Sequence, residues 1–178
     1  MTARDTVLIA LFAALTAALG LLPPIPVPLV PVPVTAQTLG VMLAGCLIGP
    51  RRASLSILLL LVLVAIGLPL LSGGRGGLSV FVGPSVGFLI GWVFGAGAIG
   101  FIATRMGTTL TALFVANCVG GIGVVYVFGI PAMAIVLDLP LATAALGSSV
   151  FLLGDLIKAG VASTVAVAVR RAYPVAGR

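Results

Sequence analysis

Long apolar runs dominate this sequence, and they are apolar on every face of the helices they would form. Only nine basic and three acidic side chains interrupt them in 178 residues. A helix in a soluble protein needs a polar face, whereas helices that contact lipid or one another can be apolar all round. The pattern therefore predicts an all-α integral membrane protein, a six-helix bundle forming one transmembrane domain over residues 1–178.

The length needed to cross a membrane places the six predicted spans. A helix of about 20 residues crosses the hydrocarbon core, and we expect spans at 6–22, 37–49, 53–71, 83–104, 108–129 and 155–172. A further helical piece at 140–153 is too short and too close to Asp155 for a separate crossing. We expect that piece to lie at the outer surface.

The distribution of arginine predicts the orientation of the bundle. Six crossings from a cytoplasmic amino terminus leave only Arg75 outside and place seven arginines inside, namely Arg4, Arg51, Arg52, Arg105, Arg170, Arg171 and Arg178. Excess positive charge marks cytoplasmic loops. Both termini are therefore predicted in the cytoplasm, for a multi-pass protein of a bacterial or archaeal inner membrane. The basic residues form no stripe, so nucleic acid is not an expected partner.

Two connections on the predicted outer side are unusual. Residues 22–37 carry six of the twelve prolines, which forbid helix and favour a stiff, extended strap over a cavity rather than a plain linker. Residues 72–77 surround Arg75 with four glycines, whose backbone freedom lets N–H groups approach a ligand. A flexible connector is the alternative for this second segment.

The inventory of reactive side chains argues against an enzyme. The chain has no histidine, a single lysine, and no G-x-x-x-x-G-K-[ST] motif for ATP phosphates. Cys46 and Cys118 lie apart within apolar runs, so neither a disulfide nor a metal site is expected. We therefore predict no catalytic residues and no cofactor, and any ATPase must be a separate polypeptide.

Asp155 and Lys158 are the most informative ionisable residues. They lie three positions apart near the predicted start of the last helix, hence on one face. An ionised group deep in a membrane costs about 2.5–3.5 kcal/mol on the insertion scale, so such residues are functional candidates. The position of Asp155 in a first helical turn would also favour its carboxylate. A purely structural ion pair is the alternative.

Two polar residues interrupt the fifth span. Asn117 and Tyr126 are nine positions apart, which is about two and a half α-helical turns, so they should not share one face. We expect Tyr126 to form a pocket wall. Asn117 should lie deeper, and both a ligand contact and an interhelix hydrogen bond remain open for it.

Two stripes of small residues recur every fourth position and let helices approach closely. Gly83, Gly87, Gly91 and Gly95 are expected to pack against another helix of the bundle. The stripe in the first span could serve internal packing or the docking of a partner subunit, and the residues alone do not decide; it comprises Ala10, Ala14 and Ala18.

Four blocks in series resemble the BioY family, the biotin-binding S components of energy-coupling factor (ECF) transporters. They are residues 31–39 (PVPVTAQTL) running into 43–45 (LAG), 67–77 with its GLP and GGRGG elements, 83–91 (GPSVGFLIG) and 154–159 (GDLIKA). The family often has prolines just before the Gly-Asp pair, where this chain has Val150 and Leu153. The entry into the last helix should therefore differ.

The resemblance implies a six-helix fold with a biotin pocket near the outer face. It also implies that the alanine stripe docks onto a transmembrane coupling subunit, which works with two ATPases. Biotin has a ureido ring, an apolar sulfur ring and a carboxylate tail, so its pocket needs an acceptor, donors and an apolar wall. The predicted substrate-binding residues are Gln37, Arg75, Asn117, Tyr126, Asp155 and Lys158.

The three charged side chains of this set each have a chemical reason to contact biotin. Asp155 can accept from the ureido N–H groups, Lys158 can donate to a carbonyl or carboxylate, and Arg75 can meet the carboxylate tail. Three alternatives remain open at this stage. They are an S component for another vitamin such as riboflavin or thiamin, a self-sufficient secondary transporter, and a structural membrane subunit. No internal repeat supports the secondary transporter.

Overall fold

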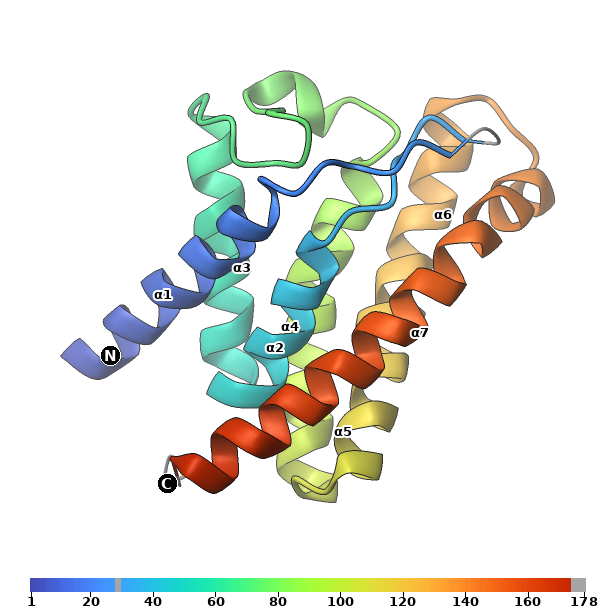
Figure 1. Ribbon diagram of the computed structural model, residues 1–178. Helices are drawn as coiled ribbons and strands as arrows, with labels where there is room; N and C mark the ends of the chain where they lie inside the picture. Colours follow the sequence, from blue (N-terminus) through green and yellow to red (C-terminus); the bar gives the residue numbers. More distant parts are fainter. Residues whose placement is uncertain (28–29, 174–178) are drawn as a thin grey trace.

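The computed structural model describes residues 1–27 and 30–173 (Figure 1). Over those ranges its regular secondary structure is helical, apart from two isolated bridges. Seven α-helices are joined by turns, by a 3₁₀ turn at Leu78–Phe81 and by a π-helical segment, η2. The α-helices are α1 (Ala3–Leu19), α2 (Gln37–Ile48), α3 (Pro50–Ala65), α4 (Val86–Met106), α5 (Leu110–Ala116), α6 (Val125–Val136) and α7 (Leu141–Ala172).

Local chemistry explains where several helices begin and end. Thr2 and Asp5 form a reciprocal capping box at the start of α1. α3 starts directly after α2 because Gly49 adopts a positive φ of 79° and Pro50 occupies the first turn. α3 ends at Ala65, six residues earlier than predicted, because Gly67 leaves the helical region at φ 110°.

Three helical units are long and apolar enough to cross a membrane among the described residues. They are Val86–Met106, Leu110–Val136 and Leu141–Ala172, with 21, 27 and 32 residues. α2 is apolar but has only 12 residues. The second unit extends beyond the predicted end at residue 129, because Pro131 is accommodated inside α6.

The prediction of a separate surface helix at 140–153 is wrong. Those residues form the first half of α7, which continues without interruption to Ala172. The chain has no proline between 141 and 172, and Gly154 alone does not end the helix. Asp155 consequently lies in the middle of α7, so the predicted stabilisation by a helix terminus does not apply.

A π-helical segment, η2 (Asn117–Val124), joins α5 to α6. Because of it, the prediction that Asn117 and Tyr126 lie on different faces is wrong. Asn117 donates to Ser163 of α7, and Tyr126 donates to Asp155 of the same helix. The wider π turn makes nine residues roughly two full turns instead of two and a half. Both side chains therefore face α7.

The predicted glycine packing face is confirmed for three of its four members. Gly87, Gly91 and Gly95 of α4 lie against the backbone of α6 and η2, and a Cβ on Gly91 would lie 2.9 Å from the Val125 carbonyl oxygen. Gly83 precedes α4, and a Cβ there would meet only carbonyl oxygens of the preceding 3₁₀ turn, at 3.9 Å. The close approach of α4 to α6 fixes two walls of the site described below.

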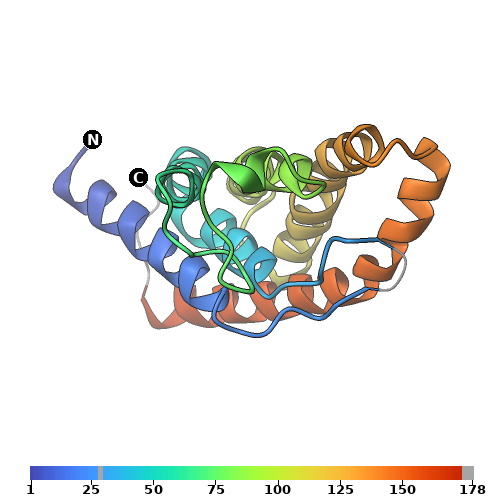
Figure 2. The same cartoon turned by 90° about the horizontal axis from the view of Figure 1, so that it is seen from above.

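The proline-rich strap is extended and lies across one end of the bundle (Figure 2). Its two legs run antiparallel where Ile25 and Val34 exchange two hydrogen bonds of 2.9 Å. Val30 and Val32 point inward and are 3% and 7% exposed. The prediction of a stiff apolar cover is confirmed for these residues, while Pro28 lies outside the described residues.

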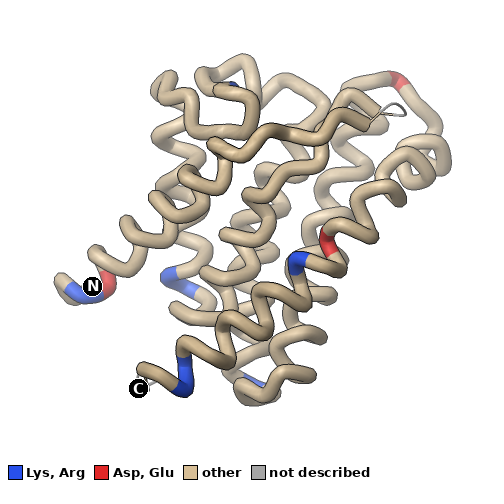
Figure 3. The backbone as a smooth tube through the Cα atoms, in the orientation of Figure 1, with Lys and Arg blue, Asp and Glu red and all other residues tan. Residues whose placement is uncertain are grey.

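Basic residues gather toward the end of the bundle at which α1 begins and α7 ends, while one acidic and one basic residue lie midway along α7 (Figure 3). The arginines at the first end are Arg4 in the first turn of α1, Arg51 and Arg52 in the first turn of α3, Arg105 in the last turn of α4, and Arg170 and Arg171 in the last turn of α7, whereas Arg75 lies in the loop that follows α3. Arg178 lies outside the described residues. The fold therefore preserves the charge asymmetry on which the orientation was predicted.

Candidate ligand-binding site

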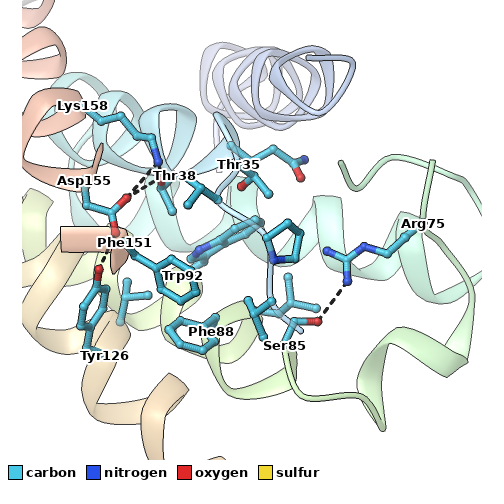
Figure 4. A pocket seen from close by; sticks show the side chains of 16 residues that line it. Thr35, Thr38, Arg75, Ser85, Phe88, Trp92, Tyr126, Phe151, Asp155 and Lys158 are labelled. Atoms are coloured by element: carbon cyan, nitrogen blue, oxygen red, sulfur yellow. Dashed lines mark hydrogen bonds and ion pairs between the residues drawn. The ribbon is translucent and has the colours of Figure 1, made fainter. Parts of the chain in front are cut away.

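A partly open cavity lies beneath the strap, where α2, α4, α6 and α7 converge. Its internal space is about 60 Å³. Apolar and aromatic side chains form most of the wall, with polar groups at both ends (Figure 4). The lining residues are Val32, Pro33, Val34, Thr35, Gln37, Thr38, Arg75, Ser85, Phe88, Leu89, Trp92, Val125, Tyr126, Phe151, Asp155 and Lys158.

Asp155 is the hub of one polar end and is only 4% exposed. Its Oδ1 accepts from Lys158 Nζ at 2.9 Å and from Thr38 Oγ1 at 3.2 Å. Its Oδ2 accepts from the Tyr126 hydroxyl at 2.8 Å. Lys158 also donates to Thr38 at 2.9 Å. A cation and two hydroxyl donors thus surround this buried carboxylate, and a buried carboxylate needs such partners in place of solvent.

Four aromatic rings form the middle of the cavity. Phe88 packs edge-to-face against Tyr126 and Phe151, with ring centroids 6.1 and 6.0 Å apart. Trp92 lies beside them and is 6% exposed. The arrangement gives an apolar wall between two polar ends, which suits an elongated ligand with a greasy centre.

Arg75 lies at the opposite polar end (Figure 4). Its Nη1 donates to Ser85 Oγ at 3.3 Å and its Nε donates to the Ser72 carbonyl at 3.2 Å. Positive φ angles at Gly73, Gly74 and Gly77 allow the tight loop that turns this arginine inward. Burial lowers the pKa of Arg75, but a guanidinium remains protonated. The loop thus presents a fixed positive charge to the cavity.

Gln37 lines the cavity but is largely committed to holding the fold. It is 1% exposed, and its amide nitrogen donates to the carbonyls of Thr16 and Leu70. Its amide oxygen accepts from the Ser72 backbone N–H at 2.9 Å. Gln37 therefore links the start of α2 to α1 and to the Arg75 loop.

Asn117 lies deeper than the cavity and is absent from its wall. Its amide donates to Ser163 Oγ at 3.0 Å and to the Ala159 carbonyl at 3.4 Å, and its oxygen accepts from Cys46 Sγ. These bonds tie η2 to α7 and α2, so the interhelix hydrogen bond is present. A contact between Asn117 and a ligand stays a prediction.

Five of the six predicted binding residues thus line one cavity, and the structure adds others that the sequence reasoning missed. Thr38 and Ser85 hold the two charged ends, and Phe88, Trp92 and Phe151 form the wall. Thr38, Ser85 and Phe88 stand inside the motif blocks, which was a usable signal. Trp92 and Phe151 carried none, because packing residues in any helix look the same.

Comparison with known proteins agrees with this architecture. The model of the BioY family matches residues 1–175. The chain belongs to the BioY family. The Biotin transporter BioY of Rhizobium etli is 51% identical, with 98% of this chain and 97% of that protein covered. The Probable biotin transporter BioY of Bacillus subtilis is 46% identical over 94% and 91% of the two chains.

A solved structure matches the whole fold of this BioY chain. The crystal structure of the S-component for biotin from an ECF-type ABC transporter has a TM-score of 0.91 and 32% sequence identity. The match covers 96% of this chain and 95% of that one. The predicted family is therefore confirmed, together with a helical membrane fold of the S-component type.

The Asp155 cluster generates a stability prediction that needs no ligand. Lys158→Ala should lower the free energy of unfolding by about 3–5 kcal/mol, because it leaves a buried carboxylate without its cation. Adding Asp155→Asn should recover part of that loss. The coupling is measured by the unfolding of three variants in one detergent, with wild type as reference: Lys158→Ala, Asp155→Asn and the double variant. A double variant that loses the sum of the two single effects would show that the pair is not coupled.

Proposed function

We propose that this protein captures biotin and acts as the substrate-binding S component of an ECF-type transporter. The single observation that carries the proposal is the cavity in which Asp155 and Arg75 lie on opposite sides of an aromatic wall. Membership of the BioY family and the names of the similar proteins support it.

The cavity has a counterpart for each part of biotin. A carboxylate has about four lone-pair sites, and the three donors on Asp155 leave acceptor capacity for a ureido N–H. Lys158 can donate to the ureido carbonyl. The apolar ring would pack against Trp92 and its neighbours, and the carboxylate tail would extend toward Arg75.

Binding requires the strap to move. A space of about 60 Å³ holds only a few water molecules, and a bicyclic vitamin with its tail is larger. The strap contributes Val32, Pro33, Val34 and Thr35 to the wall. Displacing its two legs would open the cavity while the helical walls stay in place.

We propose further that the bundle crosses an inner membrane six times with both termini in the cytoplasm. The arginines at the end with the termini support this orientation through the positive-inside rule. The cavity lies toward the other end, so biotin would enter from outside. α1 and α3 are short spans of 17 and 16 residues in this topology.

The alanine stripe of α1 supports the proposed partners. Ala10, Ala14 and Ala18 are all exposed, so the stripe is not used for packing inside this chain. We propose that it contacts a transmembrane coupling subunit, which in turn binds two ATPase subunits. ATP would be consumed by those subunits, and this chain would need no cofactor.

Titration of the purified protein in detergent tests the proposed substrate. We expect saturable biotin binding and none of riboflavin or thiamin. Asp155→Asn should weaken biotin binding at least about 30-fold, since truncating one partner of a buried charge pair costs about 2 kcal/mol or more. Asp138→Asn, at an exposed turn, is the matched control and should bind like wild type. Preferential binding of another vitamin would assign the protein to that substrate instead.

The role of Arg75 can be isolated with a modified ligand. Arg75→Gln should weaken binding of biotin about tenfold or more, because a buried charge-assisted contact is lost. It should change the affinity for biotin methyl ester less than twofold, because the ester has no carboxylate. Arg105→Gln, which removes an exposed arginine at the other end, is the control. Equal losses for acid and ester would contradict the assignment.

Docking through α1 is tested by enlarging one alanine. Ala14→Leu should abolish co-purification with the coupling subunit, because a bulky side chain prevents close helix approach. Biotin binding by the isolated variant should be unchanged, since Ala14 lies outside the cavity wall. Ala168→Leu, on an exposed position of α7, serves as the control. Retained co-purification of Ala14→Leu would remove the stripe from the interface.

A further inference from the structure

A second hollow of about 690 Å³ lies at the end of the bundle that carries the termini, away from the cavity beneath the strap. It opens between the first turns of α1, the turn from α2 to α3, the end of α4 and the end of α7. Its lining residues are Met1, Asp5, Ile9, Leu47, Ile48, Gly49, Pro50, Arg51, Arg52, Leu55, Ala103, Thr104, Gly107, Thr108 and Arg170. We call it the basic groove.

Charge in the basic groove is unbalanced. Three arginines and one aspartate line it, so its side chains carry a net charge of +2. Asp5 is already paired with Arg52 at 2.6 Å. Arg170 donates to the Cys46 carbonyl near the end of α2, which holds its guanidinium in place without neutralising it. Within residues 1–27 and 30–173, Arg51 has no carboxylate partner.

The lining of the basic groove combines apolar and charged side chains. Ile9, Leu47, Leu55 and Ala103 contribute aliphatic surface next to the three guanidinium groups. A ligand that fits both features has an anionic head and a hydrocarbon portion. Guanidinium groups bind phosphate oxygens in a planar, often bidentate geometry.

We propose that the basic groove binds the phosphate of one anionic phospholipid from the cytoplasmic leaflet, with the upper part of its acyl chains against the aliphatic wall. The proposal rests on the membrane orientation given under Proposed function. That leaflet is rich in anionic lipid, and each arginine near it contributes attraction for the head group. The groove differs from scattered surface arginines because α3 and α7 together place three cations around one hollow, and two of the three are held by partners, Arg52 by Asp5 and Arg170 by the Cys46 carbonyl.

Occupation of the basic groove would also have a structural effect. The groove is bordered by α1, whose outer face carries the proposed docking stripe, and by the end of α7, whose middle carries Asp155. A bound phosphate would bridge the Arg52 and Arg170 sides of the groove. Lipid identity would then influence the stability of the bundle without touching the biotin cavity.

Native mass spectrometry of the delipidated protein in a neutral detergent tests the proposal. Phosphatidylglycerol and phosphatidylcholine with identical acyl chains are the probes, and inorganic phosphate is the competitor. We expect one phosphatidylglycerol to bind preferentially, and Arg51→Gln to weaken it about fivefold. Arg51→Lys should keep most of the affinity. Arg52→Gln should lose more than Arg51→Gln, because it also leaves Asp5 unpaired in the groove.

Arg105→Gln is the matched control, because Arg105 lies in the last turn of α4, which borders the groove, and is not part of its lining. Equal losses in this control and in Arg51→Gln, or equal binding of both lipids, would overturn the proposal. Displacement of phosphatidylglycerol by millimolar inorganic phosphate would identify the site as one for free phosphate, which also overturns it. Biotin titration of the same samples is an independent readout, so a failure of lipid binding is distinguishable from a failure of the proposed transport function.

Discussion

The site is organised by one buried ion pair in the middle of α7. Asp155 and Lys158 are held 2.9 Å apart, and each also contacts a hydroxyl group from another helix. Thr38 brings the start of α2 to this point, and Tyr126 brings α6. In a low-dielectric interior an unpaired charge is expensive, so the positions of these three helices depend on one another. The carboxylate is thereby preorganised before any ligand arrives.

Much of this arrangement could be predicted from the sequence because it depends on local patterns. Apolar runs located the helices, and the four-residue glycine spacing identified the face where α4 meets α6. The scarcity of charge made Asp155, Lys158 and Arg75 conspicuous. A charged side chain inside a membrane is costly, so in an apolar chain its presence is an unusually strong indication of a functional site. All three line one cavity, Asp155 and Lys158 at one end and Arg75 at the other, and this follows from the fold.

Other features could not be predicted because they depend on contacts between distant segments. The length of α7 was missed because the Gly-Asp pair at 154–155, followed by Lys158, resembles a helix boundary. In the structure the ion pair and its hydroxyl partners balance these charges in the middle of the helix. Gln37 looked like a ligand-binding amide, yet backbone groups from two distant segments occupy both of its ends. Phe88, Trp92 and Phe151 became a binding wall only because α4 and α7 face the same cavity.

The π-helical segment η2 sets the direction of two side chains in the continuous helix formed by α5, η2 and α6. At its start Asn117 binds Ser163 of α7, and just after its end Tyr126 points at Asp155. Deleting one residue between 118 and 124 would restore regular α-helical bonding, and the eight remaining steps of about 100° would turn Tyr126 by roughly 80° from its present direction. The same deletion would shift Gly120 and Gly121 out of their close contacts with Ile99 and Met42. The wide π turns therefore direct Tyr126 toward the carboxylate and also keep two glycines where neighbouring helices come closest.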